Sequence, residues 1–275
     1  MRAGVIIPGG TATEQLELAV AAEAAGWDAV LTWETGYGVD PWTVMAAMAV
    51  RTARVRLGTM LTPVPWRRPW KLASQVATLD QVSGGRAFVT LGVGALSDDL
   101  TQTGEVTDLR ERAARMDEAI DVMRSLWTGD GEHHGTYYDV TCSAWLRAAV
   151  RPVQSPPPIW VAAAWPRPKS MRRVLRCDGV SPEYHLDGRD ATPDDLRAMR
   201  GWLAEQGAPD TLDVVTEGES SPEDPDSLAD VAGWAQAGAT WWLESRWGST
   251  DSLAARLADT RRRIDAGPPT ATTAN

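Results

Sequence analysis

Several residue types are scarce in this chain, and each scarcity excludes a class of protein. Among 275 residues there are only two cysteines, Cys142 and Cys177, which lie far apart without metal-ligand spacing around them. Two distant thiols argue against a disulfide framework and a cysteine metal centre, and they are typical of a protein kept reduced in the cytoplasm. We therefore expect a cytoplasmic protein without a metal site.

Long apolar runs and excess basic charge are missing as well. No stretch approaches the roughly 18 continuous apolar residues of a membrane helix, and the apolar run in the N-terminal MRAGVIIPGG is too short for a signal peptide. A net charge of −10 and a pI near 4.8 oppose binding to nucleic acid or to an anionic membrane. Small molecules are the expected partners, and the sequence leaves a homodimer open.

What the chain does contain is a regular alternation of strand and helix patterns. Apolar residues recur every three or four positions in the helical segments, which separate eight short apolar runs. The expected strands are 3–8, 29–33, 55–61, 87–93, 159–163, 178–181, 211–217 and 240–244. Runs that are apolar on both faces indicate a buried parallel sheet, and eight such units favour an α/β (β/α)8 TIM barrel. An open doubly wound sheet is the alternative.

The length is sufficient for one barrel domain, which we place at residues 1–266. Residues 128–158, between the fourth helix and the fifth strand, are too long for an ordinary connection and predict an insertion that forms a lid or an edge structure. Residues 267–275 have no apolar anchor, and we expect this tail to be disordered.

Polar and aromatic residues follow several expected strands, and barrel active sites lie at the carboxyl ends of the strands. From strand ends alone, the candidates are Trp66 after strand three, His185 after strand six, Glu217 at the end of strand seven and Glu244 at the end of strand eight. Carboxylates that share one mouth repel each other, which raises their pKa values.

The segment from Thr52 to Gly94, TARVRLGTMLTPVPWRRPWKLASQVATLDQVSGGRAFVTLGVG, resembles two strand–helix units of the luciferase-like, flavin-dependent oxidoreductases. Similar segments follow along most of the chain, including AEAAGWDAVLTWE, PPPIWVAAAWPRP, CDGVSP and AGATWWLES. The resemblance implies a TIM barrel that uses FMN or coenzyme F-420, which is an 8-hydroxy-5-deazaflavin.

The same resemblance assigns positions to the cofactor. A bulge after strand three, often with a non-proline cis peptide, supports the redox ring in the family, and it corresponds here to Thr59, Met60 and Leu61. The turn after strand four corresponds to Gly94, Ala95 and Ser97. The phosphate position corresponds to Ala163, Ala164 and Trp165, where the family often has two glycines, with Arg167 as a nearby positive charge.

Related sequences have Trp-Asp-His at the end of strand two, whereas this chain has Trp33, Glu34 and Thr35. Threonine cannot replace an imidazole that titrates near neutrality, so the resemblance leaves Glu34 as the proton-handling group there. A salt bridge from Glu34 to a rim arginine is the alternative. We expect Glu34 and His185 to be catalytic and Trp33, Thr35, Trp66, Glu217 and Glu244 to contact substrate.

The resemblance implies a luciferase-like oxidoreductase or monooxygenase that acts on a small hydrophobic organic substrate. Two other interpretations stay open. The barrel could have lost its cofactor and act as an isomerase or lyase through its rim carboxylates and His185, or it could bind a ligand without turnover.

Overall fold

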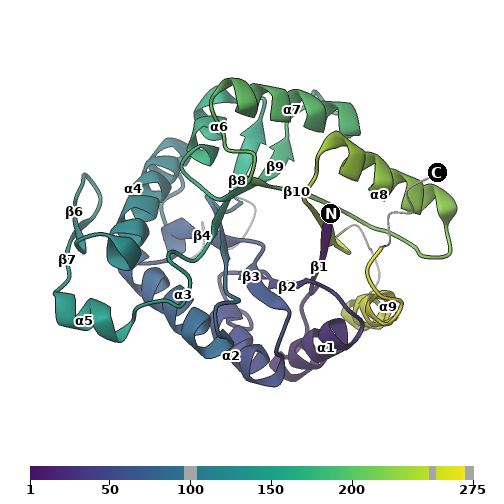
Figure 1. Cartoon of the computed structure of the whole chain (residues 1–275), viewed down its shortest axis with the longest axis horizontal. Helices are drawn as coiled ribbons and strands as arrows, with labels where there is room; N and C mark the ends of the chain where they lie inside the picture. The colour runs from purple at the N-terminus through teal and green to yellow at the C-terminus, as the bar shows by residue number, and fades with distance from the viewer. Residues whose placement is uncertain (96–103, 248–251, 270–275) are drawn as a thin grey trace.

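The computed structural model describes residues 1–95, 104–247 and 252–269, in which parallel strands form a barrel surrounded by helices (Figure 1). Eight strands match the expected apolar runs. They are β1 (Arg2–Ile6), β2 (Ala29–Thr32), β3 (Arg56–Thr59), β5 (Val89–Gly92), β8 (Ile159–Trp165), β9 (Gly179–Tyr184), β10 (Asp213–Gly218) and β11 (Trp241–Glu244).

The sheet runs in the order β3-β2-β1-β11-β10-β9-β8-β5-β4, and its two ends meet. The short strand β4 (Thr62–Pro63) continues β3 after a break at Met60 and Leu61, whose peptide bond is cis. β3 pairs with β2 and β4 with β5, while Leu57 of β3 forms a parallel bridge to Ala87. The TIM barrel is therefore confirmed, and the open sheet is excluded.

Helices follow the strands on the outside of the barrel, as expected from the periodicity. They are α1 (Ala12–Ala24), α2 (Pro41–Arg51), the 3-10 turn η1 (Val64–Trp66), α3 (Pro69–Ser83), α4 (Leu109–Thr128), α6 (Pro168–Val174), α7 (Pro193–Glu205), α8 (Pro225–Ala237) and α9 (Leu253–Asp265). Gly84 and Gly238 end α3 and α8 in the left-handed conformation that favours glycine. Among the described helices, none has the length and apolar character needed to span a bilayer.

The core has two layers, and alternate residues of each strand belong to different layers. The inner layer fills the barrel and includes Leu31, Trp160, Val215, Trp241 and Leu243. The outer layer lies between strands and helices and includes the intervening residues of the same strands, such as Val30, Val161, Val214 and Trp242. Side-chain alternation within a strand therefore decides which residues beyond its end face the barrel mouth.

The expected insertion contains the antiparallel hairpin of β6 (Glu132–His134) and β7 (Asp139–Thr141), followed by α5 (Ala144–Ala149). Glu118 of α4 accepts hydrogen bonds from the backbone N–H groups of Thr136 and Tyr137, at 2.9 Å each. A cavity of about 470 Å³ separates the insertion from α3 and α4. β6, β7 and α5 lie on the outer side of these helices (Figure 1). Residues 270–275 of the expected tail lie outside the described residues.

Candidate active site

Two carboxylates face the barrel mouth from neighbouring strands. Val215 of β10 lies in the inner core layer, and a Cβ added to Gly179 of β9 would meet the inner Trp160 side chain at 2.4 Å. Side chains alternate along a strand, so Glu217 faces the interior like Val215, and Glu183 faces it like Gly179. The register pairs Asp213 with Gly179 and Val214 with Val180, and further along the same two strands the charge of Glu183 acts on Glu217.

The surroundings of Glu217 disfavour its charged form. The residue is exposed at the end of β10, yet neighbouring protein atoms displace part of the water around its carboxyl group. This desolvation raises the pKa of Glu217, the charge of Glu183 raises it further, and a hydrogen bond from the indole of Trp247 opposes both effects. The mouth therefore holds a carboxyl group that takes up a proton more readily than a free glutamate.

An aromatic and apolar floor lies at the same end of the barrel. Trp33 and Met60 pack against the inner core layer, and the rings of Trp33 and Trp247 meet edge to face with centroids 6.0 Å apart. Trp247 is not among the site residues that the strand-end pattern predicts. The signal for it is the alternation that continues from the inward-facing Trp241 and Leu243 beyond the end of β11. The floor offers a flat apolar surface to a ligand.

Glu34 faces the other side of the barrel wall. Leu31 and Trp33 belong to the inner side of this chain segment, and the Glu34 carboxylate accepts a 2.6 Å hydrogen bond from Arg67 Nε. Arg67 also contacts Asp40 at 3.1 Å, and these groups border a cleft of about 350 Å³ that Thr35 and Trp66 line as well. The salt bridge that the sequence left as the alternative for Glu34 is present.

Burial and the ion pair shift the pKa values of Glu34 and Arg67 in opposite directions. The Glu34 side chain is only 6% exposed, and burial raises the pKa of its carboxyl group although Arg67 acts to lower it. Burial lowers the pKa of Arg67, but Glu34 and Asp40 outweigh burial and raise it. The attraction to Arg67 therefore offsets only part of the free-energy cost of burying the charged Glu34 carboxylate.

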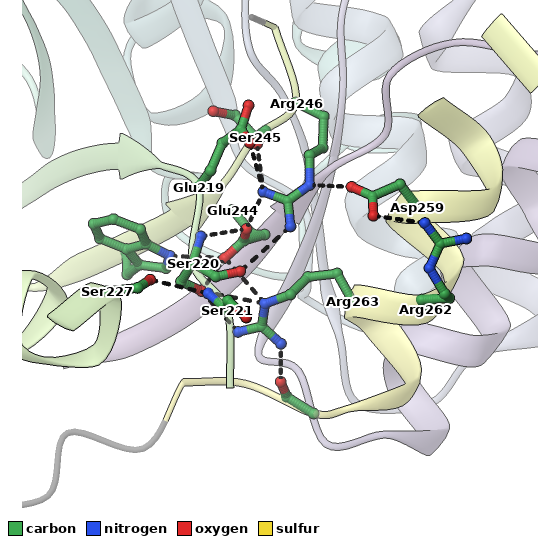
Figure 2. A network of polar contacts seen from close by, with 12 residues as sticks. Glu219, Ser220, Ser221, Ser227, Glu244, Ser245, Arg246, Asp259, Arg262 and Arg263 are labelled. Carbon is green, nitrogen blue, oxygen red and sulfur yellow. Dashed lines mark hydrogen bonds and ion pairs between the residues drawn. The ribbon is translucent and has the colours of Figure 1, made fainter. Parts of the chain in front are cut away.

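Glu244 also faces away from the mouth, because it shares the outer side of β11 with Trp242. It is 1% exposed and accepts hydrogen bonds from Ser220 N at 2.8 Å and Trp242 Nε1 at 3.1 Å. Arg246 and Arg263 form ion pairs with its carboxylate at 2.8 and 3.4 Å, as Figure 2 shows. This buried network joins the loops after β10 and β11 to α9, a place different from the substrate contact expected for Glu244.

The residues expected to support a redox ring lie together at the bulge between β3 and β4. Thr59 is fully buried, and its hydroxyl accepts a 3.1 Å hydrogen bond from Thr62, so it supports the bulge from within. Leu61 lies over Gly92, where an added Cβ would meet its side chain at 2.6 Å. Gly94 has a φ of 73°, and Arg112 donates to its carbonyl oxygen. Ala95 is exposed beside Gly94, and Ser97 lies outside the described residues.

The residues expected at the phosphate lie at the end of β8. The Ala164 N–H already donates to Ser170 Oγ at 2.9 Å, and Glu183 is the register partner of Ala164 on β9. Arg167 is exposed at the start of α6, while Ala163 is buried and the Trp165 ring packs beside that of Trp202. Exposed basic side chains, rather than the Ala164 N–H, are therefore the groups available to an anion. His185 is exposed directly after β9.

Comparison with known proteins shows that almost the whole chain is similar to one protein family. A family model described as "Luciferase-like monooxygenase" matches residues 2–264. The crystal structure of the monooxygenase RslO1 from Streptomyces bottropensis superposes with a TM-score of 0.72 at 22% identity, over 97% of this chain and 98% of that one. This structural similarity supports the TIM-barrel fold.

Two curated relatives differ in their cofactor. The oxygenase component of a flavin-dependent trigonelline monooxygenase from Acinetobacter baylyi is 33% identical over 63% of this chain and 49% of its own length. An F420-dependent glucose-6-phosphate dehydrogenase from Amycolatopsis mediterranei is 36% identical over 55% of this chain and 47% of its own length. The chain spans about half the length of these relatives.

Proposed function

Because the chain belongs to the luciferase-like monooxygenase family, we propose that it is an oxidoreductase that holds a flavin or the deazaflavin F420 at the barrel mouth. The observation that supports this proposal best is the apolar floor of Trp33 and Met60, which closes the barrel core beneath the mouth. A flat aromatic ring can pack on such a surface, and relatives that use a flavin or F420 share the sequence pattern.

The residues present fit the ring of such a cofactor. Met60 and Trp33 provide apolar contact, and the bulge with Leu61 and the backbone at Gly94 would support one edge of the ring. For the phosphate, the exposed side chains of Arg167, Lys169 and Arg172 would supply charge. When bound, the cofactor supplies the redox chemistry, which is hydride transfer for a deazaflavin and also reaction with oxygen for FMN.

The chain itself would position the substrate and manage its proton. Trp33, Met60 and Trp247 would exclude water from one side of the mouth, so that the apolar part of a small organic substrate packs there. Glu217 faces this space with a raised pKa, and it is the group that we propose holds a proton beside the substrate. His185, at the exposed rim, is a second proposed proton carrier.

Titration with FMN and with F420, each followed by quenching of cofactor fluorescence, tests the proposal. We expect one of them to bind saturably at micromolar concentration, and Met60→Gln to weaken that binding because it places an amide on the apolar floor. Leu109→Gln, at a position that is 53% exposed on α4, is the matched control. Failure of both cofactors to bind, or equal binding by the Met60→Gln variant, would contradict the proposal. Oxygen consumption by the reduced complex then separates monooxygenase from dehydrogenase chemistry.

A further inference from the structure

The cavity between the insertion and helices α3 and α4 is separate from the residues of the barrel mouth. Its volume, about 470 Å³, lies in the range of sites that hold small organic ligands. Most of its lining residues are apolar, among them Trp70, Leu126, Trp127, Val140, Leu146 and Val150. The cavity therefore offers an apolar surface that the proposed redox function does not use.

The protein leaves part of this apolar surface uncovered. Trp70 and Leu146 are 36% and 46% exposed, and α5, which carries Leu146, has no buried residue. The cavity is open because the other lining residues on this face of α3 are small, namely Ala73, Ser74 and Ala77. An apolar ligand in the cavity would remove these surfaces from water, which favours its binding.

Two cationic side chains border the same cavity. Lys71 and Arg147 both line it, and neither forms an ion pair with a carboxylate in the part of the chain that the structure describes. Arg147 donates instead to two carbonyl oxygens, from Nη1 to Gly129 at 2.6 Å and from Nε to Cys142 at 3.3 Å. These bonds hold the guanidinium in place without neutralising it, and they leave Nη2 available to a ligand.

The other charges near the cavity do not cancel these cations. Asp139 also lines the cavity, but its side chain is 81% exposed and is hydrogen-bonded to His134 at 2.8 Å. Asp130, on which Arg147 also acts, is exposed and lies outside the lining. The net charge of −10 repels an anion only weakly here, because salt screens charges that lie beyond about 8–10 Å. A carboxylate beside Lys71 and Arg147 would gain charge-assisted hydrogen bonds.

We propose that this cavity is a second ligand site, which binds an organic carboxylate with an apolar body. The apolar body lies against Trp70, Trp127 and Leu146, and the carboxylate lies toward Lys71 and Arg147. A neutral ligand of the same shape gains the apolar contact but not the charge-assisted hydrogen bonds. The site therefore selects its ligand by charge as well as by shape.

Two probes of nearly equal shape test the selection. Naphthalene-2-carboxylate and naphthalene-2-carboxamide differ in the charge of the polar group, and isothermal titration calorimetry measures the binding of both to the full chain. We expect the carboxylate to bind at least about tenfold more tightly, as one hydrogen bond between charged groups would provide. Lys71→Gln should reduce this preference several-fold. Arg110→Gln, which removes one exposed positive charge at the start of α4, should keep it.

Ser74→Phe tests the location of the site. Ser74 lines the cavity, so the phenylalanine ring would fill it and should weaken binding of the carboxylate at least about tenfold. Thr78→Phe, one turn further along α3 and outside the lining, is the control and should leave binding unchanged. Cys142 also lines the cavity. With the carboxylate at about ten times its dissociation constant, the reaction of Cys142 with N-ethylmaleimide should therefore slow about tenfold by mass action, as mass spectrometry would measure.

Three outcomes would overturn the proposal. One is equal affinity of the native chain for the two probes. Another is carboxylate binding that Ser74→Phe leaves intact and that does not protect Cys142, because the ligand then lies elsewhere. The third is a dimer that dissociates on Ser74→Phe in sedimentation velocity while neither probe binds, which would assign the cavity to a second copy of the chain. Failure of FMN and F420 to bind would contradict the proposed function and leave this inference intact.

Discussion

Arg67 and Glu34 form an ion pair with a 2.6 Å hydrogen bond on the outer side of the barrel wall. Arg67 directly follows η1, and Glu34 lies in the loop between β2 and α2. The pair therefore joins the loop after β2 to the loop after η1. Its position removes the Glu34 carboxylate from the space that Trp33 and Trp247 border. The pair is therefore a structural contact between loops.

Glu34→Gln should lower the free energy of unfolding and leave the rate of the reaction unchanged. Loss of a hydrogen bond between charged groups costs about 1.5–3 kcal/mol, and Arg67 keeps Asp40 as a partner. We expect the free energy of unfolding in urea to fall by an amount of this order, with an unchanged single-turnover rate per folded, cofactor-loaded molecule. A rate that falls a hundredfold at full cofactor occupancy would return Glu34 to the mechanism.

Glu217→Gln should raise stability, and only at neutral or alkaline pH. The pKa of Glu217 is raised in the folded chain, so its contribution to stability is present below the pKa of the unfolded chain and is lost as the pH rises through the folded value. Above that value the native protein carries a partly desolvated carboxylate, which the charge of Glu183 disfavours further. The melting temperature of the variant should exceed that of the native chain at pH 8 and equal it near pH 4. Glu205→Gln should show no such difference between the two pH values.

Gly92→Ala should destabilise the barrel at the proposed ring site. Its Cβ would lie 2.6 Å from the Leu61 side chain, which is held between the bulge and β5. Overpacking of this kind costs about 1–3 kcal/mol. Gly201→Ala in α7 is the control, since nothing lies within 4 Å of the added Cβ and alanine favours a helix by about 0.5–1 kcal/mol. Urea denaturation should show opposite signs for the two variants.

Glu244→Ala should be among the most damaging single substitutions at the rim. It leaves Arg246 and Arg263, which are 10% and 3% exposed, without their shared carboxylate. Removal of one partner from a buried ion pair costs about 3–5 kcal/mol. Glu219→Ala removes an exposed partner of the same Arg246 and should cost under about 1 kcal/mol. Similar losses for the two variants would show that the network of Figure 2 does not stabilise the loops.

The two cysteines should differ in reactivity. Burial raises the pKa of the Cys177 thiol to about 12, and the residue is 8% exposed, whereas Cys142 is half-buried in the insertion. Because the thiolate is the reactive form, a disulfide reagent should modify one thiol in the native protein and both after denaturation. Cys142→Ser should abolish the native reaction. Fast modification of Cys177 in that variant would contradict its burial.

The sequence by itself determined the number and order of the strand–helix units. Alternating apolar runs and amphipathic segments are local patterns, and local chemistry also ends the helices. Gly84 and Gly238 end α3 and α8, and Thr192 caps α7 with Asp195 as its partner. Eight such units have few ways to bury a parallel sheet on both faces, so the closed barrel followed from the pattern. The position of the bulge at Met60 and Leu61 followed from the family resemblance.

Only the tertiary structure decided which rim residues face the mouth. Strands buried on both sides are apolar at every position, so Val214 and Val215, or Trp241 and Trp242, carry no alternation that marks the inner face. A shift of one residue reverses the direction of a side chain. For this reason Glu34, Glu217 and Glu244 cannot be distinguished from the sequence. In the closed barrel Glu217 faces inward, whereas Glu34 and Glu244 pair with arginines on the outer side. Contacts between distant segments, such as Trp33 with Trp247, exist only because the first and last strands pair.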